Sequence, residues 1–238
     1  MLHVILLEAA LELVPPELSA KKMVQKQAYR RKKKPTEILL DQTYHGQAMT
    51  QLKDGTRRGR PDIVFFCLQS LLETPLCKAG FMTVHIQLYD GRIVQVDSAV
   101  RIPRNYERFV GLMEQLLLVG QVPPEGAPLL KIQDPGLGEL ISSLRGDSKD
   151  SLALLAMEGG KQTGLDNLLS VLPPSLEAPV ILGVGAFPHG DFQHDMQSLF
   201  DVRIELDRDV MMAWHVCAEV LWMYSLKHDV VRERYSSE

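Results

Sequence analysis

A glycine-rich loop is the part of this sequence whose residue types are best suited to holding a ligand. Residues 179–192 begin as an apolar, β-branched run typical of a buried strand and continue into a loop that contains Gly185, Gly190 and Asp191. Glycine lets the backbone approach a ligand closely, and open α/β sheets bind ligands beyond the carboxyl ends of their strands. We therefore expect a ligand site at this loop, with a tight turn between two core elements as the alternative.

The loop lacks the motifs of the common nucleotide-binding sites. The run from Gly183 to Gly185 is not followed by the third glycine of a dinucleotide fingerprint, and no Gly-x-x-x-x-Gly-Lys-Ser/Thr run occurs in the chain. A nicotinamide, flavin or phosphate-loop site is therefore not expected. A metal site is also not expected, because two histidines and two acids on a loop without cysteine partners are a weak ligand set: His189, Asp191, His194 and Asp195.

Arginines gather at two points that are suited to binding phosphate groups. Arg60 and Asp62 flank Pro61 directly before an apolar run, residues 63–72, that is typical of a helix. Asp62 either complements the dipole of that helix or holds the Arg60 guanidinium in one orientation by a charge-assisted hydrogen bond. A second group surrounds the expected N-cap residue of another helix, where it makes an anion site unless surface salt bridges occupy it: Arg101, Arg104 and Arg108.

A basic segment precedes both groups. Eight lysines and arginines, with no acid among them, lie between residues 21 and 34 of a chain whose formal net charge is −4. A local basic surface on an acidic protein indicates a polyanionic partner at one face. A solvated basic loop is the alternative.

An alternation of strands and helices positions these residues. We expect a core strand rather than a signal peptide at residues 2–7, because Glu8 interrupts the apolar run and no basic segment precedes it. An Asp-Gly turn predicts a hairpin over residues 83–96. In the last third, strands at 152–157, 180–184 and 202–206 alternate with helices, and the first of these strands is expected to end at Glu158. The pattern predicts a largely parallel α/β sheet. The length of 238 residues allows one large domain or one domain with an elaboration.

The expected C-terminal helix, residues 210–226, is apolar on nearly every side. A helix at the surface of a monomer would be amphipathic, so we expect a second cover besides the sheet, namely another subunit. Cys67, Cys77 and Cys217 are odd in number and widely spaced, as in the reduced thiols of a cytosolic protein. No apolar run reaches the roughly 18 residues that span a bilayer.

The sequence resembles the pseudouridine N1-specific methyltransferases of small-subunit (16S) ribosomal RNA, which act in ribosome biogenesis and belong to the SPOUT (α/β-knot) superfamily. Three runs carry the resemblance, and together they cover most of the chain. The first is Arg60-Pro61-Asp62, the second extends from Val100 to Met113, and the third is the loop from Gly185 to Phe192. Because a eukaryotic-style N-terminal tail is absent, the resemblance is to archaeal members.

This resemblance implies a fold and a cofactor. It implies one α/β-knot domain over residues 1–238, with a deep trefoil knot at about 150–230. It further implies that a basic insertion at 21–37 and the hairpin at 83–96 are additions that grip RNA, and that the protein is a homodimer. It also implies that three loops hold S-adenosylmethionine. The third loop lacks a proline that relatives carry there. The implied cofactor-binding residues are Leu155, Gly185, Gly190, Asp191, Phe192, Leu206, Asp207, Arg208, Asp209, Val210 and Met211.

For RNA binding the resemblance assigns Arg60, Arg101, Arg104 and Arg108, with Asp62 as the acid that steadies Arg60. The expected reaction is methyl transfer from S-adenosylmethionine to N1 of a pseudouridine that is splayed out of its loop. Arg60 and Asp62 orient the substrate, and Asp62 is less favoured as a base. A non-catalytic, rRNA-binding ribosome assembly factor is the alternative, because basic residues are dense and no general base is obvious.

Overall fold

The protein is built around one mixed β-sheet, seen in a computed structural model that describes residues 1–192 and 194–236. Within these residues the sheet has eight strands in the order β4-β5-β3-β2-β1-β7-β6-β8. Five of them form its parallel part, as the strand and helix alternation predicts: β1 (Leu2–Ala9), β2 (Met82–Leu88), β6 (Leu152–Gln162), β7 (Val180–Gly185) and β8 (Val202–Glu205).

The other strands extend the sheet in antiparallel fashion beyond β2. They are β3 (Ile93–Val96), β4 (Gln121–Val122) and β5 (Leu130–Gln133). The predicted hairpin is confirmed, since β2 pairs antiparallel with β3 through a turn in which Gly91 has φ +92°. Because β2 also pairs with β1, the hairpin is integral to the sheet.

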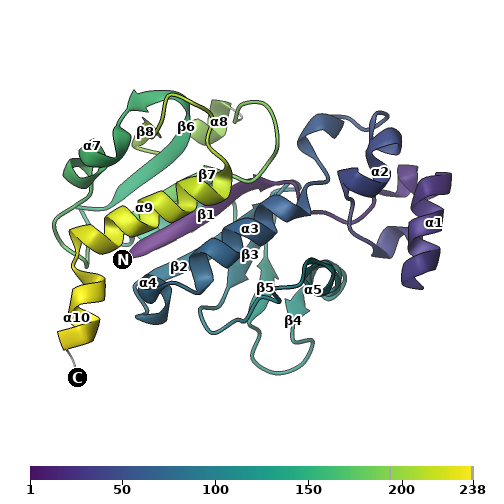
Figure 1. The fold of residues 1–238 in the computed structure, drawn as a ribbon, viewed down its shortest axis with the longest axis horizontal. Coiled ribbons are helices and arrows are strands. Elements are labelled where there is room, and N and C mark those ends of the chain that lie inside the picture. Colours follow the sequence, from purple (N-terminus) through teal and green to yellow (C-terminus); the bar gives the residue numbers. More distant parts are fainter. Residues whose placement is uncertain (193, 237–238) are drawn as a thin grey trace.

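Helices cover both faces of this sheet, and Figure 1 shows the face on which α3 (Pro61–Leu72) and α9 (Ala213–Lys227) lie side by side. This face also carries α4 (Pro75–Lys78), α5 (Tyr106–Val119) and α7 (Gly164–Val171), with α10 (Val230–Ser236) after them. The opposite core is closed by α6 (Leu137–Arg145) and α8 (His194–Gln197). Pro61 occupies the first turn of α3 and Asn105 caps α5, as expected from the sequence.

A small separate core lies at one end of the molecule, outside the sheet (Figure 1). It is formed by α1 (Lys22–Arg31) and α2 (Gln42–Met49) with the 3₁₀ helices η1 (Pro16–Leu18), η2 (Pro35–Glu37) and η3 (Gly55–Arg57) nearby. The alternative of a solvated basic loop at residues 21–34 is therefore wrong for most of this segment, because it folds as α1. Val24 and Ala28 give α1 a buried side that packs into this small core.

Two predicted boundaries are also wrong. Strand β6 does not end at Glu158 but continues to Gln162, since its pairing with β8 shifts register between Ala156 and Lys161 and then resumes. Helix α9 starts at Ala213 rather than at Val210. The three cysteines are free and buried. Among the described residues no helix is long and apolar enough to cross a membrane.

Candidate functional site

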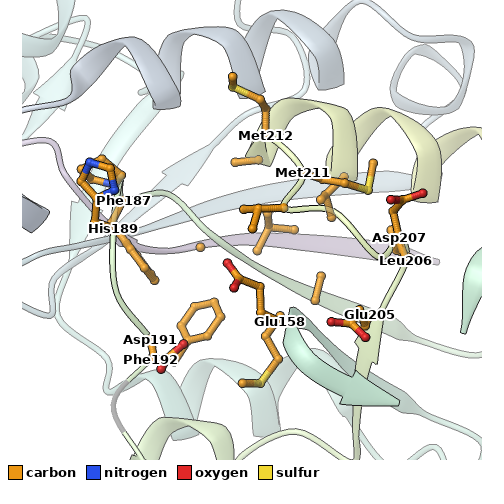
Figure 2. Close-up of a pocket in the computed structure, with 18 of the residues that line it drawn as sticks. Glu158, Phe187, His189, Asp191, Phe192, Glu205, Leu206, Asp207, Met211 and Met212 are labelled. Carbon is orange, nitrogen blue, oxygen red and sulfur yellow. The ribbon is translucent and has the colours of Figure 1, made fainter. Parts of the chain in front are cut away.

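A cleft of about 750 Å³ opens at the carboxyl ends of β7 and β8, beside residues 156–159 of β6. Parallel strands bring their carboxyl ends to one edge of a sheet, and the loops that follow β7 and β8 line the cleft together with this part of β6 and the start of α9. Figure 2 shows Phe187 and His189 on one side and Leu206 and Asp207 on the other, with Glu158 between them. The glycine-rich loop is thus part of a cavity, as its sequence predicts.

The second loop, which follows β7, depends on a missing side chain. A Cβ at Gly185 would stand 2.9 Å from the Phe187 ring and 3.0 Å from the Phe192 ring. These rings pack edge to face with their centroids 5.2 Å apart, and Phe192 is 9% exposed. Gly185 therefore allows two aromatic rings to close against the end of β7 and form an apolar wall of the cleft.

Arg57 fixes the outer side of this second loop. Its Nη1 donates a 2.6 Å hydrogen bond to the Asp191 carbonyl oxygen, its Nη2 forms an ion pair with Glu8, and its guanidinium carbon lies 3.9 Å from the Phe187 ring centroid. A Cβ at Gly190, where φ is +90°, would stand 2.7 Å from Arg57 Nη1. Sequence reasoning missed this function of Arg57, since its loop partner lies 134 residues away.

Acidic side chains give the cleft a negative character. The residues that line it include five acids and only two arginines, Arg60 and Arg208. A cationic ligand is favoured by such a surface. The carboxylate of Glu205 in β8 also accepts a 3.0 Å hydrogen bond from the amide of Gly159 in β6, which joins these two strands beside the cleft. The five acids are Glu158, Asp191, Glu205, Asp207 and Asp209.

The predicted cofactor-binding residues all line the cleft except one. Leu155 pairs with Gly183 in the sheet and is wholly buried in the core, and the lining residues of β6 are those from Ala156 to Gly159. In the third loop, the Asp207 carboxylate accepts a 2.8 Å hydrogen bond from the Asp209 amide. The lining residues that were predicted from the sequence are Gly185, Gly190, Asp191, Phe192, Leu206, Asp207, Arg208, Asp209, Val210 and Met211.

Arg60 and Asp62 form a two-pronged ion pair at the rim of the cleft. Arg60 Nε and Nη2 donate to the two Asp62 carboxylate oxygens at 2.8 and 2.7 Å. These hydrogen bonds raise the pKa of Arg60 above its ordinary value. The interpretation of Asp62 as the residue that orients Arg60 fits this geometry, since a forked pair fixes the plane of the guanidinium.

A second hollow of about 420 Å³ adjoins Arg60 on the side of α2 and α5 and is lined by Gln42, Thr43, Arg60, Asp62 and Tyr106. The Tyr106 hydroxyl donates a 3.0 Å hydrogen bond to Asp41. Burial, followed by the nearby Asp41 carboxylate, raises the pKa of Tyr106 far above its ordinary value, so the hydroxyl stays protonated. Arg60 lines both the cleft and this second hollow, and Asp62 lies beside it in the second hollow.

The remaining predicted arginines lie at the surface: Arg104 and Arg108 flank Tyr106 of this hollow in the sequence, whereas Arg101 lies near Glu73, after the opposite end of α3 from Arg60. Arg101 and Arg104 precede α5, Arg108 is in its first turn, and all three are exposed. Arg101 is 3.8 Å from Glu73, and neither Arg104 nor Arg108 forms an ion pair with any residue that the structure describes. In contrast, Arg58 is 9% exposed and binds Glu12 through two hydrogen bonds, so it is part of the framework.

The histidines and acids of the second loop give no metal centre within residues 1–192 and 194–236, where no group of three or more metal-ligating side chains is found. The His194 side chain lies outside the described part of the chain.

Comparisons with known proteins place this architecture in context. A sequence model described as EMG1/NEP1 methyltransferase matches residues 4–224. The chain is 41% identical over 221 residues to the ribosomal RNA small subunit methyltransferase Nep1 of Staphylothermus marinus, covering 92% of this chain and 93% of that protein. It is 40% identical over 223 residues to the Nep1 of Pyrococcus furiosus, covering 94% and 96%.

A solved structure has the same fold. The crystal structure of Archaeoglobus fulgidus Nep1 bound to S-adenosylhomocysteine superimposes with a TM-score of 0.82 and 33% sequence identity, covering 95% of this chain and 98% of that one. The similarity therefore extends over the sheet, the helices of both faces and the loops around the cleft.

Proposed function

The chain belongs to the EMG1/NEP1 methyltransferase family, and we propose that it transfers a methyl group from S-adenosylmethionine to small-subunit ribosomal RNA during ribosome biogenesis. The resemblance to this family that the sequence motifs indicate is thereby confirmed. The observation that carries the proposal is the adjacency of two hollows that share Arg60, one acidic and one open toward α2 and α5. Such an arrangement suits a cationic cofactor beside an RNA nucleoside.

The cleft suits S-adenosylmethionine in its charge and in its apolar wall. This cofactor supplies an electrophilic methyl group on a positively charged sulfonium, and it carries an ammonium group as well. Glu158 and Asp207 supply negative charge, while Phe187 and Phe192 supply an apolar wall beside Gly185. The relative from Archaeoglobus fulgidus binds the demethylated product, S-adenosylhomocysteine, in its crystal structure.

The second hollow holds the target nucleoside in this proposal. The side chains of Gln42 and Thr43 offer donors and acceptors to the edge of a base, and the forked pair of Arg60 and Asp62 stands between this hollow and the cleft. A displacement at the methyl carbon requires the accepting nitrogen at about 3 Å and in line with the breaking bond. We propose N1 of a pseudouridine as that nitrogen, so the protein acts mainly by positioning.

Asp62 acts as a positioning residue rather than as the base. Both of its carboxylate oxygens accept hydrogen bonds from Arg60, and the pair is partly exposed. The N1 proton therefore leaves to solvent after transfer in this proposal. The exposed Arg101, Arg104 and Arg108 bind phosphates of the same RNA in this proposal, because they gather before and within the first turn of α5, which contributes Tyr106 to the second hollow.

We also propose a homodimer, because helices α3 and α9 leave apolar side chains uncovered along one shared face. Trp222 is 55% exposed, Leu226 is 64% exposed, and Phe66 of α3 is 43% exposed while its ring packs 5.0 Å from Trp214 of α9. A second copy is the economical cover for such a face.

The proposed trefoil knot fits the chain path, in which β8 lies at the sheet edge while α9 returns across β7 to α3 (Figure 1).

Titration of S-adenosylmethionine into the protein, followed by transfer of its labelled methyl group to a small-subunit rRNA loop, tests the proposal. We expect saturable cofactor binding that Gly185→Trp abolishes, and transfer to a loop containing pseudouridine but not to the same loop containing uridine. Arg60→Ala should lose RNA binding and transfer while keeping cofactor binding, whereas Asp62→Asn should retain measurable transfer. RNA binding without cofactor binding would instead support a non-catalytic assembly factor.

A further inference from the structure

We propose that Glu8, near the end of β1, is a positioning residue that couples the cofactor cleft to the second hollow, so that the cofactor and the RNA each bind more tightly when the other is present. The inference rests on the proposed function in one respect, namely that the two hollows are the sites of the cofactor and of the RNA nucleoside. Among the described residues, those that line these hollows do not include Glu8. Glu8 therefore acts through its neighbours.

The backbone of Glu8 is in a strained conformation. Its φ is +48°, in the left-handed region that glycine adopts freely and that other residues rarely adopt. The pairing of β1 with β2 is interrupted at the same point by a register shift between Leu6 and Ala9. Strain of this kind persists only where the surrounding structure holds it. A glutamate at a position suited to glycine therefore indicates that its carboxylate is needed there.

The Glu8 carboxylate holds Arg57 against the loop that follows β7. It forms an ion pair with Arg57 Nη2, and the Glu8 side chain is only 14% exposed, so water screens this pair less than it would at the surface. Arg57 Nη1 donates to the Asp191 carbonyl oxygen, and the guanidinium covers the Phe187 ring. Phe187 and Asp191 line the cofactor cleft (Figure 2). The carboxylate thus reaches the cleft through one side chain.

Backbone hydrogen bonds next to Glu8 connect the same loop to Arg60. The Leu7 carbonyl oxygen accepts a 2.8 Å bond from the Ala186 amide, and the Ala10 amide donates a 2.9 Å bond to the Ala186 carbonyl oxygen. The Ala10 carbonyl oxygen in turn accepts a 3.0 Å bond from the Arg60 amide. Ala186 is the first residue after β7, so two hydrogen bonds separate Arg60 from the loop that forms the apolar wall of the cleft.

The segment 57–60 also contacts the second hollow. Arg60 lines this hollow, and the Gly59 carbonyl oxygen accepts a 2.8 Å hydrogen bond from the amide of Gln42, which lines it as well. A nucleoside that fixes Arg60 and Gln42 therefore also restrains the segment whose first residue, Arg57, is paired with Glu8.

These contacts make the strained conformation of Glu8 common to both sites. It is held on one side by the loop after β7, which the cofactor orders, and on the other by the segment 57–60, which the RNA orders. Two ligands that favour the same conformation of a protein favour each other's binding, and the effect is equal in both directions. The coupling ensures that the complex that contains both reactants is the one that forms most readily.

The test measures this coupling in the full chain. Calorimetry gives the Kd of S-adenosylhomocysteine, which has no methyl group to transfer, with and without a saturating small-subunit rRNA loop that contains pseudouridine. Fluorescence anisotropy gives the Kd of the same loop with and without saturating S-adenosylhomocysteine. In the parent protein each ligand should lower the Kd of the other about fivefold or more, and the two factors should be equal.

Three variants assign the coupling to Glu8. Glu8→Gln removes the charge and keeps the shape, whereas Glu8→Gly removes the side chain together with the backbone strain. Both should reduce the coupling to about twofold or less while each ligand still binds alone. Glu8→Asp keeps the charge and tolerates a positive φ, so it should retain part of the coupling. Relief of strain should keep the Tm of Glu8→Gly close to that of the parent protein, whereas a merely structural residue would lower the Tm and leave the coupling intact.

Glu12→Gln is the matched control. Glu12 pairs with Arg58 through two hydrogen bonds, so this ion pair joins the same two segments of the chain, and the Glu12 side chain is 18% exposed. Arg58 Nη1 donates to the Lys53 carbonyl oxygen, on the side of the small core. Glu12→Gln should therefore keep the full coupling.

The inference is overturned if the parent protein binds the two ligands independently, if Glu8→Gln and Glu8→Gly keep the full coupling, or if Glu12→Gln loses as much coupling as they do. Methyl transfer from S-adenosylmethionine to the loop is measured in parallel. Transfer with independent binding of the two ligands would leave the proposed function standing and remove this inference. Coupling that depends on Glu8, without transfer, would do the reverse. A protein that binds only one of the two ligands would refute both.

Discussion

The Arg57 guanidinium lies over the face of the Phe187 ring, with 3.9 Å between the guanidinium carbon and the ring centroid. The same side chain bonds the Asp191 carbonyl oxygen and forms an ion pair with Glu8 at the end of β1. Arg57 thus ties the loop that follows β7 to η3, three residues before Arg60. The two hollows that we propose for the RNA nucleoside and for the cofactor are therefore connected through one short segment.

Removal of this contact should weaken cofactor binding without unfolding the protein. We expect Arg57→Ala to raise the Kd for S-adenosylmethionine about tenfold, since a cation–π contact and charge-assisted hydrogen bonds are lost. The Kd of Arg57→Lys, which keeps the charge but not the planar fork, should lie between the Kd of the parent protein and that of Arg57→Ala. Calorimetric titration measures this, with Arg92→Ala as the control because Arg92 forms a comparable ion pair with Asp90 far from the cleft. An unchanged Kd in Arg57→Ala would contradict the inference that Arg57 holds the loop after β7 in place for the cofactor.

Two glycines of β7 give a matched pair for separating binding from stability. A Cβ at Gly185 meets the movable rings of Phe187 and Phe192 at the cleft, whereas a Cβ at Gly183 meets Leu7 and Phe200 at 2.7 Å inside the core. Gly183→Ala should therefore lower the free energy of unfolding by about 1–3 kcal/mol and leave the cofactor affinity unchanged. Gly185→Ala should instead raise the Kd for the cofactor and change the free energy of unfolding less than Gly183→Ala does. Denaturant unfolding and calorimetry measure both, and equal effects of the two changes on binding would refute this division.

The sequence could predict the cleft because its parts follow from local patterns. Three apolar runs end in polar or glycine-rich loops, and parallel strands bring such ends together. Arg60 and Asp62 are two residues apart at a helix start, so their pairing is also a local matter. Arg57 with Asp191, and Arg31 with Glu114, are joined only by the tertiary fold. No spacing within the chain can reveal such pairs. This is why sequence reasoning missed the contacts of Arg57 and of Arg31.

Local propensity also misplaced some boundaries. Glycine weakens a strand, so Gly159 and Gly160 predict an end, but pairing with β8 resumes at Lys161 and carries β6 on to Gln162. In the basic segment, charge alone indicated a loop. The two buried positions at Val24 and Ala28 are one helical turn apart, and their packing decides for a helix.

The uncovered face of α3 and α9 predicts the oligomeric state. Trp222→Glu places a charge at the centre of the proposed dimer contact, where aromatic side chains carry much of the binding energy. We expect this variant to be monomeric at concentrations where the parent protein is a dimer, as measured by analytical ultracentrifugation. Leu118→Glu, at a 48% exposed position of α5, should leave the dimer intact. A parent protein that is itself monomeric would refute the proposed dimer.

Buried histidines predict a loss of stability in mild acid. Burial lowers the pKa of His3 and of His85 from 6.5 to about 4, and it lowers the pKa of His45 and His228 as well. The unfolded chain binds protons at these groups below pH 6.5 while the folded chain does not, so stability is full above about pH 6.5 and falls as the pH drops toward 4. Each group contributes at most about 1.4 kcal/mol per pH unit in this window.

His85→Leu separates this effect from general acid denaturation. The Nδ1 of His85 has no hydrogen-bond partner among the described residues, and its Nε2 makes one long contact, 3.4 Å to Thr83 Oγ1, so leucine removes the titrating group at the cost of that single contact. The variant should lose stability less steeply between pH 6.5 and 4 than the parent protein, as followed by Tm against pH. The exposed His215, changed to asparagine, serves as the control. A slope that stays the same in His85→Leu would contradict the assignment.

Glu114 predicts how firmly α1 is attached to the rest of the protein. Its buried carboxylate binds Arg31, Lys33 and the Leu39 amide, so Glu114→Ala leaves two cations and an amide without their acceptor. Because Arg31 and Lys33 are themselves partly exposed, they can regain water, and we expect a loss of about 2–3 kcal/mol rather than the larger cost of a fully buried pair. Urea unfolding measures this, against the exposed Glu139→Gln as the control. Trypsin should cut within α1 of the variant before the sheet unfolds. A rate of cleavage within α1 equal to that of the parent protein would mean that α1 holds its place without this anchor.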